Sequence, residues 1–251
     1  MITELAAAIE SGRAVVLATV IRTERSVPRR PGSKMLVYAD GTTAGTIGGG
    51  EMEHRVTVEA ADAFADGRPR LITYTLIDPG SGDAGVCGGE AEIYLEPFMP
   101  KPKLIIVGAG HVGRAVSDLA QWLDFQTVVW DDREAILDDA DHVDVALTGS
   151  MADALREHPL TANDSAVMVT RNVALDLEIL PLLLETPVRY IGLMGSQRRW
   201  DTTYGTLIEQ GISEDRFDRI HAPIGVEINA ETPAEIAVSI LAEVIGDRRA
   251  P

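Results

Sequence analysis

The feature that most constrains the fold is a glycine-rich turn between a predicted strand and a predicted helix. The apolar run 104–107 leads directly into Gly108-Ala109-Gly110-His111-Val112-Gly113, which fits the pattern G-x-G-x-x-G. A helix predicted from His111 to Leu123 is followed by a second strand that ends in Asp131, eighteen positions after Gly113. This order of strand, glycine turn, helix and acidic strand end is typical of a βαβ unit that binds a dinucleotide.

Beyond Lys103 the chain continues as strands alternating with helices, which predicts a parallel sheet with helical crossovers. The expected strands cover residues 103–107, 126–130, 143–147, 166–170 and 188–193. A closing helix is expected from Thr232 to Ile245, with Thr232 and Glu235 forming a capping box at its start. Residues 103–251 are therefore predicted to form a Rossmann-like domain with a doubly wound parallel sheet.

The preceding residues predict a mixed α+β module. Its expected elements are strands at 14–21, 34–38, 42–47, 71–77 and 90–96, and a helix at 51–65 after Gly48-Gly49-Gly50. The segment around Pro97, Pro100 and Pro102 interrupts the pattern and is interpreted as a linker. We therefore expect an α/β protein of two domains, residues 1–98 and residues 103–251.

The charge and the cysteine content exclude several classes of protein. The chain has 22 Lys and Arg against 39 Asp and Glu, a formal charge of −17, which disfavours nucleic acid and anionic membranes as partners. A single cysteine cannot form an internal disulfide, which suits a reducing cytoplasm. The first residues lack a secretory signal, and the longest apolar run, 14–21, is too short to span a bilayer.

The glycine turn supplies the first group of candidate binding residues. Gly108 would allow the tight turn, Gly110 the close approach of a diphosphate to the helix N-terminus, and Gly113 the packing of helix on strand. Asp131 would accept a hydrogen bond from a ribose hydroxyl, and His111 could contribute through its backbone or its side chain. The alternative is a turn that only packs a helix on a strand.

A second group of candidates surrounds Cys87, which is followed by Gly88 and Gly89. A thiolate is a soft metal ligand, and the flanking glycines favour a binding loop over a buried apolar filler, the other common role of a free cysteine. Arg29 and Arg30 form a cationic turn that suits either anion capture or a solvated loop. The histidines have no metal-ligand spacing, so Cys87 is the single metal-ligand candidate.

Several motifs in sequence order resemble the XdhC/CoxI family, accessory proteins of xanthine dehydrogenase and related molybdenum hydroxylases. The N-terminal motifs are Ser26-Val27-Pro28-Arg29-Arg30-Pro31-Gly32-Ser33-Lys34-Met35, Gly45-Thr46-Ile47-Gly48-Gly49-Gly50 with Glu53, and Cys87-Gly88-Gly89. The C-terminal motifs are the glycine turn, Asp131-Asp132-Arg133, Tyr190-Ile191-Gly192-Leu193-Met194-Gly195-Ser196, Ala222-Pro223-Ile224-Gly225 and Thr232-Pro233-Ala234-Glu235-Ile236-Ala237. One departure is Gln197, where a basic residue is expected. The resemblance covers nearly the whole chain.

The resemblance implies a chaperone, rather than an enzyme, that binds molybdenum cofactor, protects it during sulfuration and delivers it to an apo molybdenum hydroxylase. It implies cofactor binding by Cys87 and by the glycines Gly48, Gly49 and Gly50, with a cysteine desulfurase as a further partner. The cofactor form, molybdopterin or its cytidine dinucleotide, stays open, as does a homodimer. The alternatives are an NAD(P)- or FAD-dependent oxidoreductase, for which the sequence offers no evident acid–base pair, and a nucleotide sensor.

Overall fold

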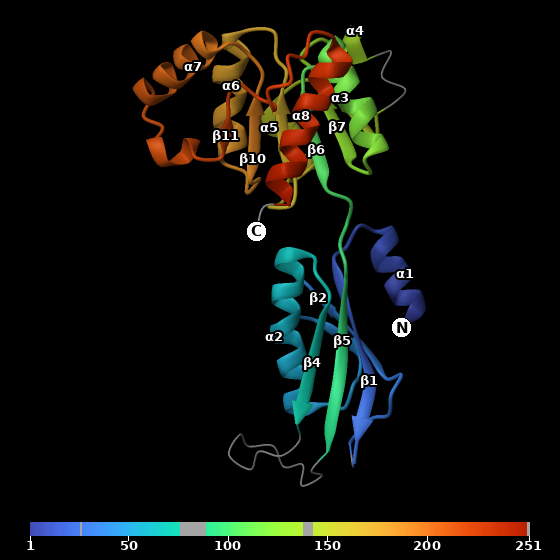
Figure 1. Ribbon diagram of the computed structural model, residues 1–251. Helices are drawn as coiled ribbons and strands as arrows, with labels where there is room; N and C mark the ends of the chain where they lie inside the picture. The colour runs from blue at the N-terminus through green and yellow to red at the C-terminus, as the bar shows by residue number, and fades with distance from the viewer. Residues whose placement is uncertain (26, 76–88, 138–142, 250–251) are drawn as a thin grey trace. The chain divides into compact units, whose positions relative to one another are not determined.

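The computed structural model describes the chain except for residues 26, 76–88, 138–142 and 250–251. The chain divides into two compact units, Met1–Pro100 and Lys101–Pro251 (Figure 1). Cys87 and Gly88, which the sequence selects as binding candidates, lie outside the described residues.

The first unit contains an antiparallel sheet of five strands in the order β3-β2-β1-β5-β4. The strands are β1 (Val15–Glu24), β2 (Lys34–Tyr38), β3 (Thr43–Gly45), β4 (Arg70–Thr75) and β5 (Glu90–Phe98). The register of the central pair places Glu24 opposite Glu90, and that of β1 with β2 places Thr19 opposite Lys34. The predicted hairpin of β2 and β3 is present, with Met35 paired to Gly45.

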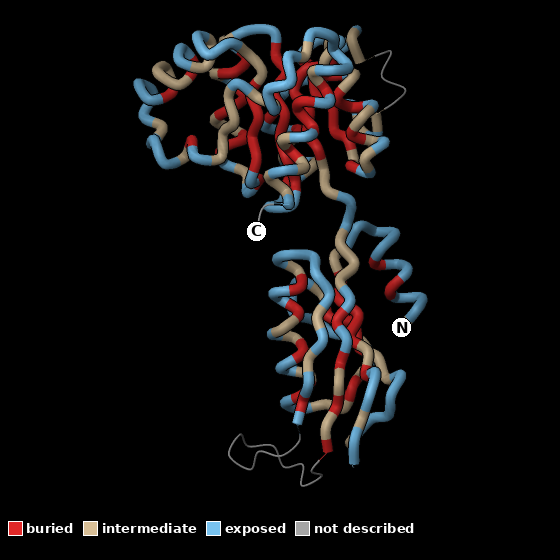
Figure 2. The backbone as a smooth tube through the Cα atoms, viewed as in Figure 1, coloured by how far each residue is buried: buried red, intermediate tan, exposed pale blue. Residues whose placement is uncertain are grey.

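One helix covers each face of this sheet, as the alternation of apolar residues along β1 requires. Val16, Ala18 and Val20 pack with α2 (Gly50–Asp66), whereas Val15 and Leu17 pack with α1 (Ile2–Glu10). Figure 2 shows the buried residues concentrated along the strands and on the inner sides of the helices. The unit is thus the mixed α+β module that the sequence predicts.

The second unit contains a parallel sheet of six strands in the order β11-β10-β9-β6-β7-β8. The strands are β6 (Lys103–Val107), β7 (Gln126–Trp130), β8 (Val145–Leu147), β9 (Ser165–Met168), β10 (Tyr190–Leu193) and β11 (Ile220–His221). Counted from β6 as the first strand, this is the order 3-2-1-4-5-6 of a dinucleotide-binding sheet. The strand order reverses between β6 and β9.

Helices cover both faces of the parallel sheet, and this confirms the predicted doubly wound Rossmann-like domain. Residues Leu104 and Ile106 of β6 pack toward α3 (His111–Trp122) and α8 (Pro233–Arg248), which lie side by side (Figure 1). Ile105 and Val107 pack on the opposite face. The remaining helices are α4 (Glu134–Leu137), α5 (Met151–Glu157), α6 (Val173–Leu184), α7 (Gln197–Glu209) and the 3-10 turn η1 (Glu214–Phe217).

Candidate functional site

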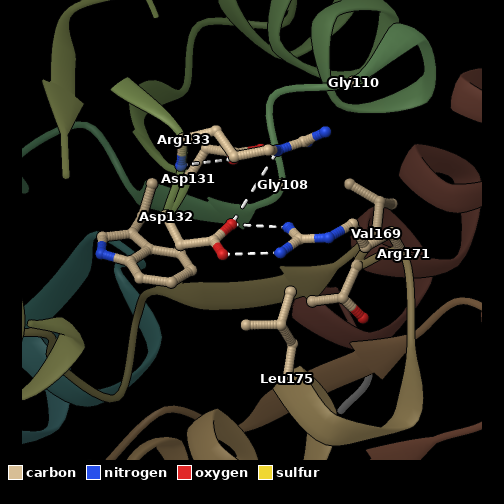
Figure 3. A pocket seen from close by; sticks show the side chains of 10 residues that line it. Gly108, Gly110, Asp131, Asp132, Arg133, Val169, Arg171 and Leu175 are labelled. Carbon is tan, nitrogen blue, oxygen red and sulfur yellow. Dashed lines mark hydrogen bonds and ion pairs between the residues drawn. The ribbon is translucent and has the colours of Figure 1, made fainter. Parts of the chain in front are cut away.

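A pocket of about 200 Å³ lies at the carboxyl ends of three neighbouring strands, β7, β6 and β9. This is the point where the strand order reverses, and ligands of open α/β sheets bind at such points. The residues that line it come from the end of β7, from the turns after these strands and from α6: Gly108, Gly110, Trp130, Asp131, Asp132, Arg133, Val169, Thr170, Arg171 and Leu175 (Figure 3).

The three glycines of the turn have three different environments. Gly108 has a φ of +114°, and a Cβ there would lie 2.8 Å from the carbonyl oxygen of Val169. A Cβ on Gly113 would lie 1.9 Å from the carbonyl oxygen of Gly108, so only glycine lets α3 approach β6 this closely. Gly110 has an ordinary φ of −68° and nothing within 4 Å of a Cβ. The backbone and packing therefore explain Gly108 and Gly113 but not Gly110.

The start of α3 adjoins this open space. Gly110 is its N-cap residue, and the helix has no side-chain cap among the residues that the structure describes. The N–H groups of a first helical turn have no partner within the helix and carry the positive end of its dipole. The arrangement at Gly110 suits the close approach of an anionic group.

Asp131 lies at the end of β7 with only 2% of its side chain exposed. Its Oδ2 accepts hydrogen bonds from the Ala109 N–H (2.8 Å) and Arg133 Nη2 (2.9 Å), and its Oδ1 accepts from Arg133 N (3.0 Å) and Nε (2.9 Å). Burial raises the pKa of this carboxyl, but these bonds outweigh burial and hold the pKa at about 2. Asp131 thus ties the glycine turn to the segment after β7.

The next residue, Asp132, forms an ion pair across the pocket. Both of its oxygens accept hydrogen bonds from Arg171, at 2.6 Å each, so the carboxylate and the guanidinium face each other in parallel (Figure 3). Asp132 follows β7, whereas Arg171 follows β9. Their side chains are 33% and 42% exposed, so water reaches both.

In the first unit, a carboxylate accepts a hydrogen bond from one N–H group of the triple-glycine turn. Glu53 accepts hydrogen bonds from the N–H groups of Gly49 (2.8 Å) and Ile47 (3.2 Å) and from the Thr46 hydroxyl (2.5 Å). Burial raises the pKa of Glu53, but the bond from Thr46 and the backbone donors lower it below its ordinary value. The Gly49 N–H is therefore already engaged by a side chain of this chain.

The other candidates of the first unit gather at one end of its sheet. Arg29 and Arg30 are exposed in the turn between β1 and β2, and a Cβ on Gly48 would lie 3.4 Å from the Pro28 ring. Gly89 is buried just before β5, whose first residue pairs with the last residue of β1. The strand register thus brings the arginine turn, the triple glycine and Gly89 to the same end.

Metal clusters and membrane-spanning helices are both absent from the described residues. Among the residues that the structure describes, no group of three or more His, Cys, Asp or Glu side chains is placed to bind a metal ion. None of the helices in the described part of the chain combines the length and the apolarity that crossing a bilayer requires. His111 is exposed at the first position of α3 and is absent from the pocket lining.

Several residues that line the pocket were not selected from the sequence. Arg171 and Thr170 follow β9 just as Asp131 follows β7, and β9 is hydrogen-bonded to β6. The sequence therefore contained a signal for these residues. In such a sheet, polar residues that directly follow the strands on either side of the first strand face the ligand crevice. Arg133 and Asp132 carried the family resemblance without a predicted role.

Comparison with known proteins gives matches over nearly the whole chain. The XdhC Rossmann domain family matches residues 104–244, and the XdhC and CoxI family matches residues 8–75. The chain is 35% identical to the uncharacterized protein YqeB of Escherichia coli K12, over 97% of this chain and 45% of YqeB. It is 31% identical to a probable xanthine dehydrogenase subunit of Bacillus subtilis 168, over 62% of this chain and 46% of that protein. The chain therefore spans about half the length of these two relatives.

A third relative matches over most of both proteins. This is the molybdenum cofactor insertion chaperone PaoD of Escherichia coli K12, 26% identical over 96% of this chain and 86% of PaoD. Among solved structures, a xanthine dehydrogenase from Bacillus halodurans aligns with 99% of this chain and 95% of its own, at 25% identity and a TM-score of 0.53. The family matches to both units, together with the observed Rossmann order of the second sheet, lead to one conclusion: the chain belongs to the XdhC and CoxI family.

Proposed function

We propose that this protein is an accessory chaperone that binds molybdenum cofactor, protects it while its sulfido ligand is installed, and delivers it to an apo molybdenum hydroxylase of the xanthine dehydrogenase type. Family membership supports the proposal, as does the match, over 96% of this chain and 86% of the relative, to a protein named as a molybdenum cofactor insertion chaperone. A cysteine desulfurase is the partner that would supply the sulfur.

The observation that carries the proposal is the unexplained glycine at the start of α3. Neither backbone angle nor packing requires Gly110, and its missing side chain leaves space beside uncapped N–H groups. A phosphate or diphosphate would fill that space and accept hydrogen bonds from those N–H groups. Molybdopterin carries a phosphate, and its cytidine dinucleotide form carries a diphosphate, so both forms suit the chemistry of this turn.

The first unit carries a second group of candidate cofactor-binding residues. By family resemblance, the Cys87 thiolate would act as a soft ligand to the molybdenum that the bound cofactor supplies. Arg29 and Arg30 are exposed, so an anion can reach both, whereas the N–H of Gly49 first has to leave Glu53. Thr75 and Gly89, the described residues on either side of the segment that contains Cys87, lie at the same end of the sheet as the arginine turn, which supports a role for both in one site of the first unit.

An NAD(P)- or FAD-dependent oxidoreductase is the second candidate, favoured by the strand order and the glycine turn. The state of Asp131 weighs against it. An acidic residue at this position of a NAD-binding domain accepts the ribose hydroxyls, whereas both Asp131 oxygens here accept bonds from Ala109 and Arg133. Steady NAD(P)H consumption by the isolated protein with a small substrate would favour this candidate.

The proposal is tested by measuring the molybdenum and pterin bound to the protein after its purification from cells that make molybdenum cofactor. Molybdenum and pterin should be present together, and the nucleotide released by acid would identify a dinucleotide form. Gly110→Val should lower the content, with at most about 1 kcal/mol lost in stability, because its side chain enters open space at a cap position. The matched control is Gly246→Val, at an exposed helix position where a Cβ also meets nothing within 4 Å. Full content in Gly110→Val would make the turn a packing device.

A further inference from the structure

The pocket of the second unit is spanned by a partly exposed ion pair. Arg171 has one side-chain partner among the described residues, the carboxylate of Asp132, which it meets at 2.6 Å through both terminal nitrogens. The pair joins the segment after β7 to the segment after β9, and both residues line the pocket (Figure 3). Ligand and Asp132 would therefore compete for the same guanidinium.

The two arginines of the pocket differ in how easily they can leave their partners. Arg133 binds Asp131, whose side chain is 2% exposed, so its departure would leave a buried carboxylate with fewer donors. Breaking such a buried pair is strongly unfavourable. Arg171 binds Asp132, whose side chain is 33% exposed, so water can replace the arginine. Of the two, Arg171 is the one that can exchange partners.

The backbone on either side of Arg171 is held by a second arginine, whereas the Arg171 side chain is held by Asp132 alone among the described residues. Arg199 of α7 donates hydrogen bonds to the carbonyl oxygens of Thr170 (3.1 Å) and Asn172 (3.2 Å), the residues on either side of Arg171. Arg199 is in turn fixed by the fully buried Asp176, through Nε at 2.7 Å and Nη2 at 2.8 Å. An arginine on a fixed backbone can bind a ligand at a defined position with little ordering cost.

We propose that Arg171 binds the phosphate of a nucleotide-type ligand in this pocket, and that Asp132 holds Arg171 there until the ligand displaces it. With the pair closed the pocket measures about 200 Å³, below the range of about 300–1,000 Å³ that is usual for ligand sites. Separation of the pair widens the pocket and frees a bidentate donor for phosphate. The inference deepens the proposed function, on which its choice of ligand rests.

If the ligand and Asp132 compete for Arg171, removing Arg171 should weaken ligand binding and removing the Asp132 charge should strengthen it. Calorimetric titration of the full chain with cytidine 5′-diphosphate and with ADP measures affinity for a diphosphate. Arg171→Gln should weaken both by roughly tenfold to a hundredfold, the loss of a charge-assisted hydrogen bond. Asp132→Asn should instead strengthen both by about two- to fivefold, because the competing ion pair is gone. The double variant should bind as weakly as Arg171→Gln alone.

A charge-matched pair of controls lies on α5, where Arg156 and Asp153 form an exposed ion pair at 2.8 Å away from the pocket lining. Arg156→Gln and Asp153→Asn should leave both affinities unchanged. Cytidine, which has no phosphate, should be no more sensitive to Arg171→Gln than to Arg156→Gln. Weakening by Asp132→Asn as well as by Arg171→Gln would identify a merely structural pair and overturn the inference, as would the absence of diphosphate binding by the unmodified protein at millimolar concentration.

Failure of this inference is distinguishable from failure of the proposed function. If the protein carries molybdenum and pterin but neither substitution changes its affinity for the diphosphates, the proposed function stands and the role of Arg171 is refuted. Opposite shifts with Arg171→Gln and Asp132→Asn in a protein that never carries pterin support the role of Arg171 and contradict the chaperone.

Discussion

Replacing Asp131 with Asn should destabilise the second unit, because this carboxylate is a buried acceptor for four hydrogen bonds. The donors are the Ala109 N–H and three groups of Arg133, at 2.8–3.0 Å. Asn keeps one acceptor oxygen, but its NH₂ group is itself a donor and cannot accept the hydrogen bonds that the other carboxylate oxygen accepted. It also leaves the Arg133 guanidinium without its counter-charge.

The magnitude follows from the pKa of Asp131. Burial raises this pKa, but the bonds from Arg133 and Ala109 outweigh burial and lower it from 3.8 to about 2. That difference corresponds to about 2 kcal/mol of unfolding free energy at neutral pH. Because the folded-state pKa is the lower one, the stabilisation is complete above about pH 4, is about half lost at pH 3, and disappears as the pH falls through about 2.

Tryptophan fluorescence during urea unfolding measures this loss in the second unit alone. All three tryptophans, Trp122, Trp130 and Trp200, lie within Lys101–Pro251. At pH 7 the Asn variant should be about 2 kcal/mol less stable, and the gap should narrow toward pH 3. Asp153→Asn, in an exposed ion pair, should change stability by less than about 0.5 kcal/mol. Equal stability of the Asp131 variant and the unmodified protein at pH 7 would refute the reasoning.

Three further outcomes are expected. Cys87→Ala should stay folded by circular dichroism but lose most of its molybdenum and pterin; undiminished content in the folded variant would leave the thiol without a binding role. Gly113→Ala should lower the unfolding free energy by about 2 kcal/mol, because its Cβ would lie 1.9 Å from the Gly108 carbonyl oxygen, and an unchanged urea midpoint would contradict this. Limited proteolysis should cut first within 98–103, and mass spectrometry that finds cuts only elsewhere would argue against a linker there.

The fold was largely predictable because five of the six strands of the second unit lie in short, mainly apolar runs; β11, with only the two residues Ile220 and His221, was not predicted. Strand β6 lies at the predicted residues 103–107 and β7 at 126–130, whereas β9 ends at Met168, two residues before the predicted end. Helix α6 was harder to recognise, because it is apolar around most of its surface and contains Pro181. Such a helix lacks the one-sided periodicity that marks a surface helix.

The site was predictable only in part. The glycine pattern and the acidic strand end are local signals, and they selected Gly108, Gly110 and Asp131. The partners of those residues are not local: Arg171 lies 39 positions from Asp132, and the fold alone brings them together. Nor does the sequence reveal that Arg133 folds back onto Asp131, since a two-residue spacing carries no periodic signal. The ribose-binding role of Asp131 stays a prediction, and a ribose hydroxyl would have to compete with Ala109 and Arg133 for its oxygens.

The most direct test of the account is transfer of the cofactor itself. The full chain, purified with bound cofactor, is mixed with the apo form of a xanthine dehydrogenase-type hydroxylase, and molybdenum in each protein is measured after separation together with hydroxylase activity. We expect molybdenum to leave this protein and appear in the hydroxylase in step with activity, and Cys87→Ala to transfer little. A chain that carries no molybdenum or pterin, or that holds both without yielding them to the hydroxylase, would contradict the account.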